Sequence, residues 1–341
     1  MPLVPLTIPP GVVKPATPLL AKGRYWDANL VRWRSNKLLP IGGWQRITQN
    51  PLASTVRALF PVMANDGSSW LLIGCEGNLY AGEGSTYTNI TPTAFVSAES
   101  GLVGGYSAYN YGALLYGDDT DPTYPRPPSQ LSVPSFTWTM DNWGEDVLSV
   151  ASSDGRLFYY NPGNTQASVV GYSLIQSISR VSNVVTVTTT LDHTFRTGQV
   201  VTIAGVTTAS FNGTFTITGT PTLTTFTYAQ SGTNASSSGG SVTHAGTPTQ
   251  NRGVIVTPER HAVLFGMNGN PRRVGWSDQE DYAEWDFASA TTQAGFFDLD
   301  TQSRIIMATS VREGTLIWTE DEAWLMRYVG LPYIYGFERI G

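Results

Sequence analysis

Residues 136–162 read FTWTMDNWGEDVLSVASSDGRLFYYNP, and this stretch decides the predicted fold. It contains an apolar strand, a polar turn, a strongly apolar strand, a tight turn at Asp154-Gly155 and a third strand. Short apolar runs bounded by turn residues are typical of antiparallel strands. Asp-Gly is a strong hairpin signal because both central residues of a type I′ turn need a positive φ. The stretch therefore predicts a β-meander.

The same pattern recurs along the chain. The other copies are residues 56–91, 253–277 and 304–330, with turns at Glu76-Gly77, Asn268-Gly269 and Glu320-Asp321-Glu322. Repeated meanders of three to four strands predict a multi-bladed β-propeller-like body, in which each blade covers a face of the next. The pattern is unfinished at residues 337–341, so we expect further blades beyond this point or from elsewhere in an assembly.

Residues 174–246 interrupt the repeat. They hold nineteen threonines and three charged residues, Arg180, Asp192 and Arg196. Apolar and hydroxyl residues alternate at 184–190, 199–206, 213–220 and 224–230, which predicts half-buried strands. Asn212-Gly213 is expected to form a hairpin turn, and the tract NASSSGGS at 234–241 a flexible loop. The segment predicts a small inserted β-sandwich or barrel domain.

The predicted fold class is therefore all-β, in four parts. Residues 1–50 form an extended N-terminal arm and the first strands, residues 51–173 and 247–341 form propeller blades, and residues 174–246 form the inserted Thr-rich domain. The arm is expected to be extended because proline fixes φ and lacks a backbone donor. Prolines recur there at Pro2, Pro5, Pro9, Pro10, Pro15 and Pro18.

Charge is sparse and uneven. Charged residues make up 13% of the chain, about half the usual share of a globular protein. Residues 1–46 carry seven Lys or Arg against one acid, Asp27, whereas the rest of the chain sums to −12. A basic head on an acidic body favours self-association or docking, and a general nucleic-acid binder is more often basic overall.

Several other features exclude classes of protein. The single cysteine, Cys75, allows no intrachain disulfide, which fits assembly in a reducing cytoplasm. The proline-rich start is unlike a signal peptide, and no run approaches the roughly 18 apolar residues of a membrane span. We therefore expect no membrane anchor.

One acidic cluster contains residue types that can catalyse hydrolysis. Paired carboxylates for glycoside hydrolysis are available in Asp278, Glu280, Asp281, Glu284 and Asp286. The favoured interpretation is a solvated loop pinned to a blade by Trp276, Trp285 and Phe287, because charge runs are commonly surface. A glycosidase is kept as an alternative, with Asp281 and Glu284 as the residues to test.

Other motifs predict no cofactor or metal site. His193, His244 and His261 share no metal-ligand spacing, and no phosphate loop, dinucleotide fingerprint or hydrolase elbow is present. The acidic run at residues 117–122 lacks the closing Glu of a calcium loop and is expected to be an Asx-turn loop. We expect no catalytic, cofactor-binding or metal-binding residues, and a protein that is not an enzyme.

Two stretches carry a resemblance to a known family. Residues 23–46, GRYWDANLVRWRSNKLLPIGGWQR, contain a Trp-Asp-x-x-x-Val-Arg-Trp-Arg run before Gly-Gly-Trp. Residues 272–326 contain RRVGWSDQEDYAEWDF, then QAGFFDLD, then LIWTEDEAWLM. Together they resemble the tail-nozzle proteins of short-tailed bacteriophages, also called packaged-DNA stabilisation proteins. The inserted segment resembles small β-modules of phage tail proteins.

The resemblance implies a structural virion protein, assembled in the bacterial host cytoplasm. Its expected partners are itself, in a ring expected to be a hexamer, the portal-adaptor, and tail fibre or spike proteins. Such a ring would extend the DNA channel below the portal and help to retain and deliver the genome. It would lie close to packaged DNA without reading its sequence, and an acidic channel wall would reduce sticking. The alternative from another class is a carbohydrate-binding module that recognises a host receptor.

The predicted contact residues lie in the basic N-terminal stretch. They are Arg24, Tyr25, Trp26, Arg32, Trp33, Arg34 and Trp44. Trp and Arg dominate interface hot spots because they combine a large apolar area with planar hydrogen bonding. The alternative is that these tryptophans close the first blade while the arginines stay solvated.

Overall fold

The structure, a computed structural model, describes residues 11–14, 17, 19, 23–35, 37–43, 51–97 and 136–341. The chain divides into two units, Met1–Gln49 and Asn50–Gly341. The smaller unit contains a hairpin of β1 (Val31–Arg34) and β2 (Lys37–Pro40). The arm prediction for residues 1–10 and the predicted contact residue Trp44 lie outside the described residues. So does the acidic run at 117–122.

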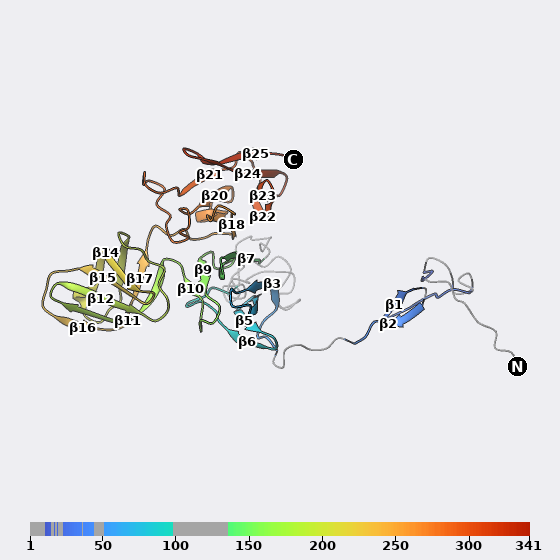
Figure 1. Cartoon of the computed structure of the whole chain (residues 1–341), viewed down its shortest axis with the longest axis horizontal. Helices are drawn as coiled ribbons and strands as arrows, with labels where there is room; N and C mark the ends of the chain where they lie inside the picture. Colours follow the sequence, from blue (N-terminus) through green and yellow to red (C-terminus); the bar gives the residue numbers. More distant parts are fainter. Residues whose placement is uncertain are drawn as a thin grey trace, which may run out of the picture. The chain divides into compact units, whose positions relative to one another are not determined.

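The described residues of the larger unit form four antiparallel meanders and a barrel (Figure 1). Blade 1 consists of β3 (Val56–Met63), β4 (Ser69–Cys75), β5 (Leu79–Glu83) and β6 (Thr86–Asn89). Blade 2 consists of β7 (Trp138–Trp143), β8 (Asp146–Ala151), β9 (Leu157–Tyr160) and β10 (Ser168–Val169). Blade 3 consists of β18 (Gly253–Val256), β19 (Ala262–Phe265), β20 (Arg273–Trp276) and β21 (Gly295–Asp298). Blade 4 consists of β22 (Ile305–Val311), β23 (Gly314–Thr319), β24 (Ala323–Gly330) and β25 (Ile334–Arg339).

The prediction of an all-β fold is confirmed, and the described helical segments are two 3₁₀ turns. These are η2 (Ala209–Phe211) and η3 (Met267–Gly269). Asn268 and Gly269 both have the positive φ expected of an Asn-Gly turn, but they lie in a seven-residue connection between β19 and β20. At Asp154-Gly155 the expectation of a type I′ turn is wrong, because Gly155 alone has a positive φ. Asp154 instead pairs with Arg156, at 2.6 Å between Oδ1 and Nε.

Consecutive blades pack face to face through apolar layers. Phe60 and Val62 of blade 1 meet Trp138 and Phe158 of blade 2. A second layer joins Leu148 and Val150 of blade 2 to Val254 and Leu264 of blade 3. A third joins Val263 and Trp276 of blade 3 to Ile317 and Trp324 of blade 4. Within the described residues, another blade thus covers both faces of blades 2 and 3 but only one face of blades 1 and 4.

Side chains of one blade also satisfy the backbone of the next. On β7, Thr139 Oγ1 accepts a hydrogen bond from the Val254 N–H at 2.8 Å, and Asp141 Oδ2 accepts one from the Val256 N–H at 2.8 Å. Alternate residues of a strand direct their N–H groups to the same edge, so two side chains at i and i+2 cap two donors of β18. A Cβ at Gly253 would lie 2.7 Å from Thr139 Oγ1, so glycine permits this approach.

The barrel is a closed ring of six strands inserted after blade 2. They are β11 (Tyr172–Val181), β12 (Val184–Thr189), β13 (Val200–Ala204), β14 (Gly213–Thr222), β15 (Thr225–Ala229) and β17 (Ser241–His244). The ring runs β11–β12–β15–β14–β13–β17 and returns to β11, while β16 (Ala235–Ser237) pairs with β11. Closure removes unpaired strand edges, which makes a seventy-residue module possible.

Two local predictions for the barrel are wrong. The tract 234–241 contains β16 and the start of β17 and is not simply a flexible loop. Asn212-Gly213 is not a two-residue hairpin, because β13 ends at Ala204 and a longer connection with η2 follows. The Asn212 side chain closes this connection on Val206, accepting from its N–H at 2.9 Å and donating to its carbonyl at 3.0 Å.

The Thr139→Val substitution should destabilise the blade 2–blade 3 junction. Valine keeps the shape but leaves the Val254 N–H without its acceptor, so we expect the free energy of unfolding to fall by about 1–2 kcal/mol. Urea denaturation measures it. Thr309→Val, on β22 in the same groove, is the matched control and should cost clearly less. Equal losses for both variants would contradict the role of this hydrogen bond.

Low pH should destabilise the barrel through His193. The ring is buried beside Phe195 and Phe226, with centroids 5.6 Å away in each case, and burial lowers the pKa of His193. The unfolded chain, with a histidine pKa of about 6.5, then takes up the proton first. Stability is therefore full above that pH and declines below it, by up to about 1.4 kcal/mol per pH unit.

The measurement compares unfolding at pH 7.5 and 5.0 for the wild type and His193→Phe. His261 is also buried with a lowered pKa and is present in both proteins, so the difference isolates His193. An identical pH dependence in the two proteins would contradict the assignment.

Candidate functional site

The basic hairpin of the smaller unit has two chemically different faces. The register pairs Arg34 with Lys37, Arg32 with Leu39 and Trp33 with Leu38. Because directly paired residues share a face, Arg32, Arg34 and Lys37 lie together, and all three are exposed. On the other face Trp33 packs edge-on against Tyr25, with ring centroids 5.2 Å apart. The backbone around Tyr25 is held by the Val13 N–H, which donates to the Tyr25 carbonyl at 2.9 Å.

The structure places six of the seven predicted contact residues. Arg24, Trp26, Arg32 and Arg34 are exposed, and Tyr25 and Trp33 are half-buried against each other. Lys37 belongs with this set, and sequence reasoning missed it. The available signal was the hairpin itself, since a turn at Ser35 sets Lys37 directly across from Arg34. A role of these residues at an interface stays a prediction.

The arrangement suits an anionic partner. Like charges directly opposite each other in a strand pair repel, so Arg34 and Lys37 are stabilised when carboxylate or phosphate oxygens lie between them. One anion is already present in this unit, since Lys14 Nζ lies 3.1 Å from Asp27 Oδ1. That pair lowers the pKa of Asp27, first through its hydrogen bond. The hairpin surface itself keeps its positive charge.

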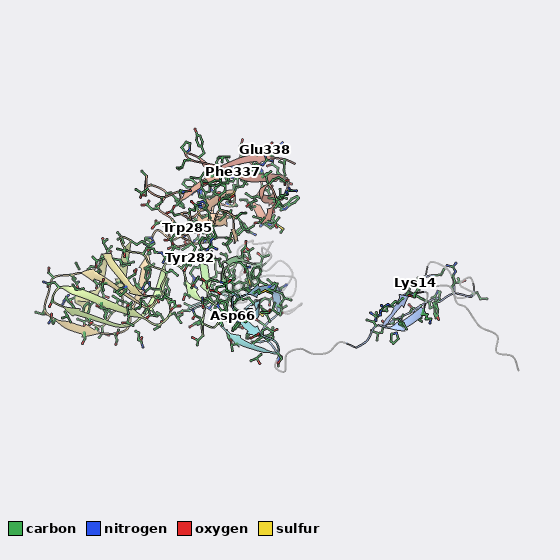
Figure 2. The ribbon with its side chains drawn as sticks, in the orientation of Figure 1. Lys14, Asp66, Tyr282, Trp285, Phe337 and Glu338 are labelled. Atoms are coloured by element: carbon green, nitrogen blue, oxygen red, sulfur yellow. The ribbon has the colours of Figure 1, made fainter. Side chains whose placement is uncertain are left out.

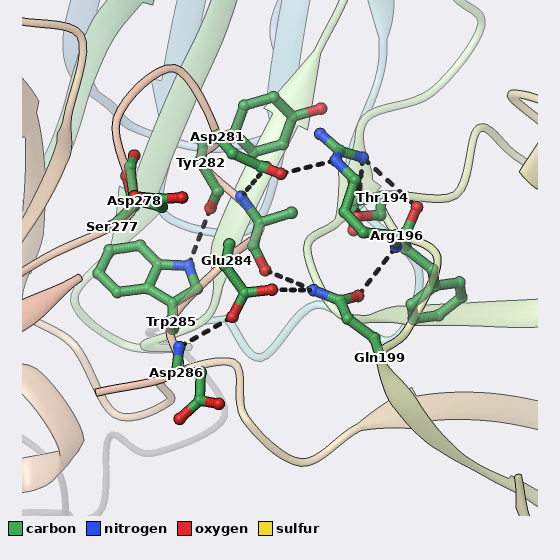
Figure 3. Close-up of polar contacts among 12 residues, drawn as sticks. Thr194, Arg196, Gln199, Ser277, Asp278, Asp281, Tyr282, Glu284, Trp285 and Asp286 are labelled. Atoms are coloured by element: carbon green, nitrogen blue, oxygen red, sulfur yellow. Dashed lines mark hydrogen bonds and ion pairs between the residues drawn. The ribbon is translucent and has the colours of Figure 1, made fainter. Parts of the chain in front are cut away.

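The acidic loop between β20 and β21 contacts the barrel (Figure 3). Arg196 Nε donates to Asp281 Oδ2 at 2.8 Å, and the guanidinium lies 5.7 Å from the Tyr282 ring. Gln199 Nε2 donates to Glu284 Oε2 at 3.2 Å and to the Ala283 carbonyl at 3.1 Å. Both partners come from the segment that leads into β13. The two carboxylates proposed for a glycosidase therefore lie in the junction between the barrel and blade 3.

Two other carboxylates of this loop, Asp278 and Asp286, accept hydrogen bonds from backbone N–H groups. Asp278 Oδ1 accepts from the Gln293 N–H at 2.7 Å, and Asp286 Oδ1 accepts from the Ala288 N–H at 3.0 Å. Trp285 is 2% exposed, and its Nε1 donates to the Tyr282 carbonyl at 2.8 Å. Burial raises the pKa of Tyr282 to about 12, so it stays protonated. These contacts give the loop a structural role, which favours the pinned-loop interpretation.

The first strands of the four blades enclose a groove of about 390 Å³. Leu59 of β3, Thr139 and Asp141 of β7, Ile255 of β18 and Ser310 of β22 are among its lining residues. Among the described lining residues, Asp141 is the one ionisable group, and burial raises its pKa. The groove is far too small for duplex DNA.

A second pocket, of about 570 Å³, is lined by aromatic side chains from blades 3 and 4. Phe297 of β21 stacks on Phe337 of β25 with centroids 4.5 Å apart, and Tyr333 is 77% exposed beside them. Figure 2 labels Phe337 and Glu338 on β25. Exposed ring faces of this kind are where the carbohydrate-binding alternative would find its stacking surfaces.

Among the residues that the structure describes, no group of three or more His, Cys, Asp or Glu side chains is placed to hold a metal ion. Cys75 is free and buried. Within the described ranges, no helix is long and apolar enough to cross a membrane.

Comparisons with known proteins identify no family. No family model matches the chain, and no curated protein matches it. Among solved structures, the chain is similar to one described as the phage phi92 endosialidase, at 13% identity and a TM-score of 0.26. The match covers 85% of this chain and 48% of that one, so the chain spans about half of its length. At this TM-score the similarity identifies neither a function nor a fold.

Arg196→Gln should loosen the junction without unfolding the barrel. The Arg196–Asp281 pair is partly exposed, so we expect a loss of less than about 1 kcal/mol in global stability. Hydrogen exchange at residues 278–286 should nevertheless rise, because the loop loses a partner. Arg273→Gln, which breaks the pair with Asp298 inside blade 3, is the control and should leave that exchange unchanged. Unchanged exchange in the Arg196 variant would contradict the junction.

Proposed function

We propose that the chain is a structural subunit of a short-tailed bacteriophage tail, of the nozzle or hub type. In this proposal it assembles with copies of itself into a ring below the portal-adaptor. The ring extends the DNA channel, helps to retain and deliver the genome, and offers docking surfaces to fibres or spikes. The protein is then a virion component assembled in the host cytoplasm, with no membrane anchor and no catalytic role.

The observation that carries this proposal is the open array of blades. Within the described residues, blades 2 and 3 have both faces covered, while blades 1 and 4 each keep part of one apolar face exposed. Exposed apolar faces on a rigid all-β body are typical of subunits that assemble. The resemblance of residues 23–46 and 272–326 to tail-nozzle proteins supplies the kind of assembly.

The charge distribution supports the same proposal. The basic hairpin presents Arg32, Arg34 and Lys37 on one exposed face, while the chain beyond residue 46 sums to −12. An acidic body does not adhere to a passing duplex, and a basic surface can bind an acidic neighbour. Among the described residues, the lining of the groove enclosed by the blades contains Asp141 and no basic side chain, which fits a role away from DNA binding.

Negative-stain imaging of the purified chain, with and without phage tail components, tests the proposal. We expect rings or short tubes with a central hole, because a tail subunit must close around a channel. Particles that stay monomeric in both conditions and decorate host cells would contradict it. That outcome would favour the receptor-binding alternative, and the aromatic pocket of blades 3 and 4 would be the place to examine.

A further inference from the structure

The free face of blade 1 is half covered and half bare. On β3 the residues Phe60 and Val62 turn toward blade 2, so Leu59 and Met63 turn the other way, and they are 61% and 73% exposed. Beside them Ile73 and Tyr80 are buried under the segment that contains Leu52. The Ala53 N–H donates to the Tyr80 hydroxyl at 3.3 Å and fixes that segment. The exposed half of this face therefore lies along β3, the first strand of blade 1.

The free face of blade 4 is also apolar along its inner strands. Ile317 of β23 faces blade 3, so its neighbours Leu316 and Trp318 face outward. Trp318 pairs with Met307 on β22, and these two side chains are 42% and 48% exposed. Leu316 pairs with Leu325 on β24, which is buried, so the bare part of this face lies along β22 and β23. At its rim, Arg327 lies 3.6 Å from Glu338.

The free faces of blades 1 and 4 are the two kinds of face that meet wherever consecutive blades pack. Within the described residues, three layers already join the face of one blade to the opposite face of the next blade. The free face of blade 4 is the one that would receive a following blade, and the free face of blade 1 is the one that would meet a preceding blade. In this chain the two faces do not cover each other, because Met63 and Trp318 are both exposed.

We propose that the free face of blade 4 in one copy binds the free face of blade 1 in a second copy. The contact repeats the blade-to-blade packing that the chain uses internally, with Met307 and Trp318 against Leu59 and Met63. Two different patches meet, so the interface is heterologous, and repeating it closes a ring or extends a filament. The inference rests on the proposed function in one respect, which is that the chain assembles with itself.

The size of the faces sets the strength of this contact. The bare part of each face spans about two strands, roughly 4.8 Å apart and about six residues long, which gives roughly 200 Å² for each face, or about 400 Å² for the pair. That is below the usual area of a stable interface, so a single contact is weak. A closed ring gives every subunit two such contacts, and assembly is therefore steeply dependent on concentration.

The test uses two single variants of the whole chain, Met63→Glu and Met307→Glu. Each places a charge in one free face, and both positions are exposed, so both variants should fold and melt like the wild type. Leu223→Glu, at an exposed position on the barrel between β14 and β15, is the matched control. Sedimentation velocity over a range of concentrations measures the assembled fraction.

We expect the wild type and the control to assemble, and each face variant to need at least about tenfold more protein to do so. A one-to-one mixture of the face variants should form a species of two chains and no larger one, at the upper end of the concentration range because a single contact holds it together. The reason is that Met63→Glu keeps an intact blade 4 and Met307→Glu keeps an intact blade 1. A monomeric mixture, a face variant that assembles as the wild type does, or a monomeric wild type would overturn the proposal.

These outcomes are separable from failure of the proposed function. A chain that is present in tail rings but whose mixed variants stay monomeric assembles through other surfaces, which overturns this inference alone. Variants that pair as expected, in a chain that tail rings never incorporate, would support this inference and overturn the tail assignment.

Discussion

Every blade of this protein is a small sheet with apolar side chains on both faces, and the rest of the structure follows from that constraint. A meander of four short strands cannot cover its own faces, so it is marginal in water unless another layer packs on it. Blade 2 shows the result, with Phe158 directed toward blade 1 and its neighbour Leu157 toward blade 3. Stacking is therefore the condition under which each blade folds.

Stacking alone would leave the blades free to slide, and polar contacts fix their register. Thr139 and Asp141 cap two donors of β18, and Trp138 Nε1 donates to the Cys75 carbonyl at 2.8 Å across the blade 1–blade 2 junction. At the blade 3–blade 4 junction the hydroxyls of Thr257 and Tyr335 lie 2.9 Å apart. Each contact satisfies a group that the adjoining apolar layer would otherwise leave unpaired, so a shifted blade is penalised.

The blades could be predicted from the sequence because their signals are local. Alternating apolar runs and turn residues lie within one meander, as at residues 136–162, and no distant partner is needed to recognise them. Strand β11 was missed because its pairing with β12 shifts between Ile175 and Ser177, which breaks the period-two alternation. A charged residue, Arg180, also occupies a buried position of this strand, where its guanidinium donates to the Thr233 carbonyl and the Gln230 side chain, so the sequence shows no apolar residue there.

Contact surfaces were harder to predict from the sequence than strands, because they depend on register and packing. A contact residue can be inferred from its type, as Arg32 and Arg34 were, but its neighbours depend on register, which placed Lys37 beside them. The ion pair of Arg196 with Asp281 joins residues far apart in the sequence, so no local pattern predicts it. The same holds for the free faces, whose exposure is a property of the stacked array and of no single strand.

The chain needs few charges because hydroxyl groups and apolar contacts occupy its surfaces instead. On the outside of the barrel, threonine hydroxyls pair across strands, with Thr202 and Thr214 at 3.3 Å and Thr222 and Thr225 at 2.7 Å. Such neutral pairs keep exposed strands polar without long-range fields, and salt does not screen them as it screens ion pairs. The packed faces of the blades are covered by apolar contacts, which likewise need no charge. A body built in this way associates through shape and apolar area, and its few charges are left to set orientation.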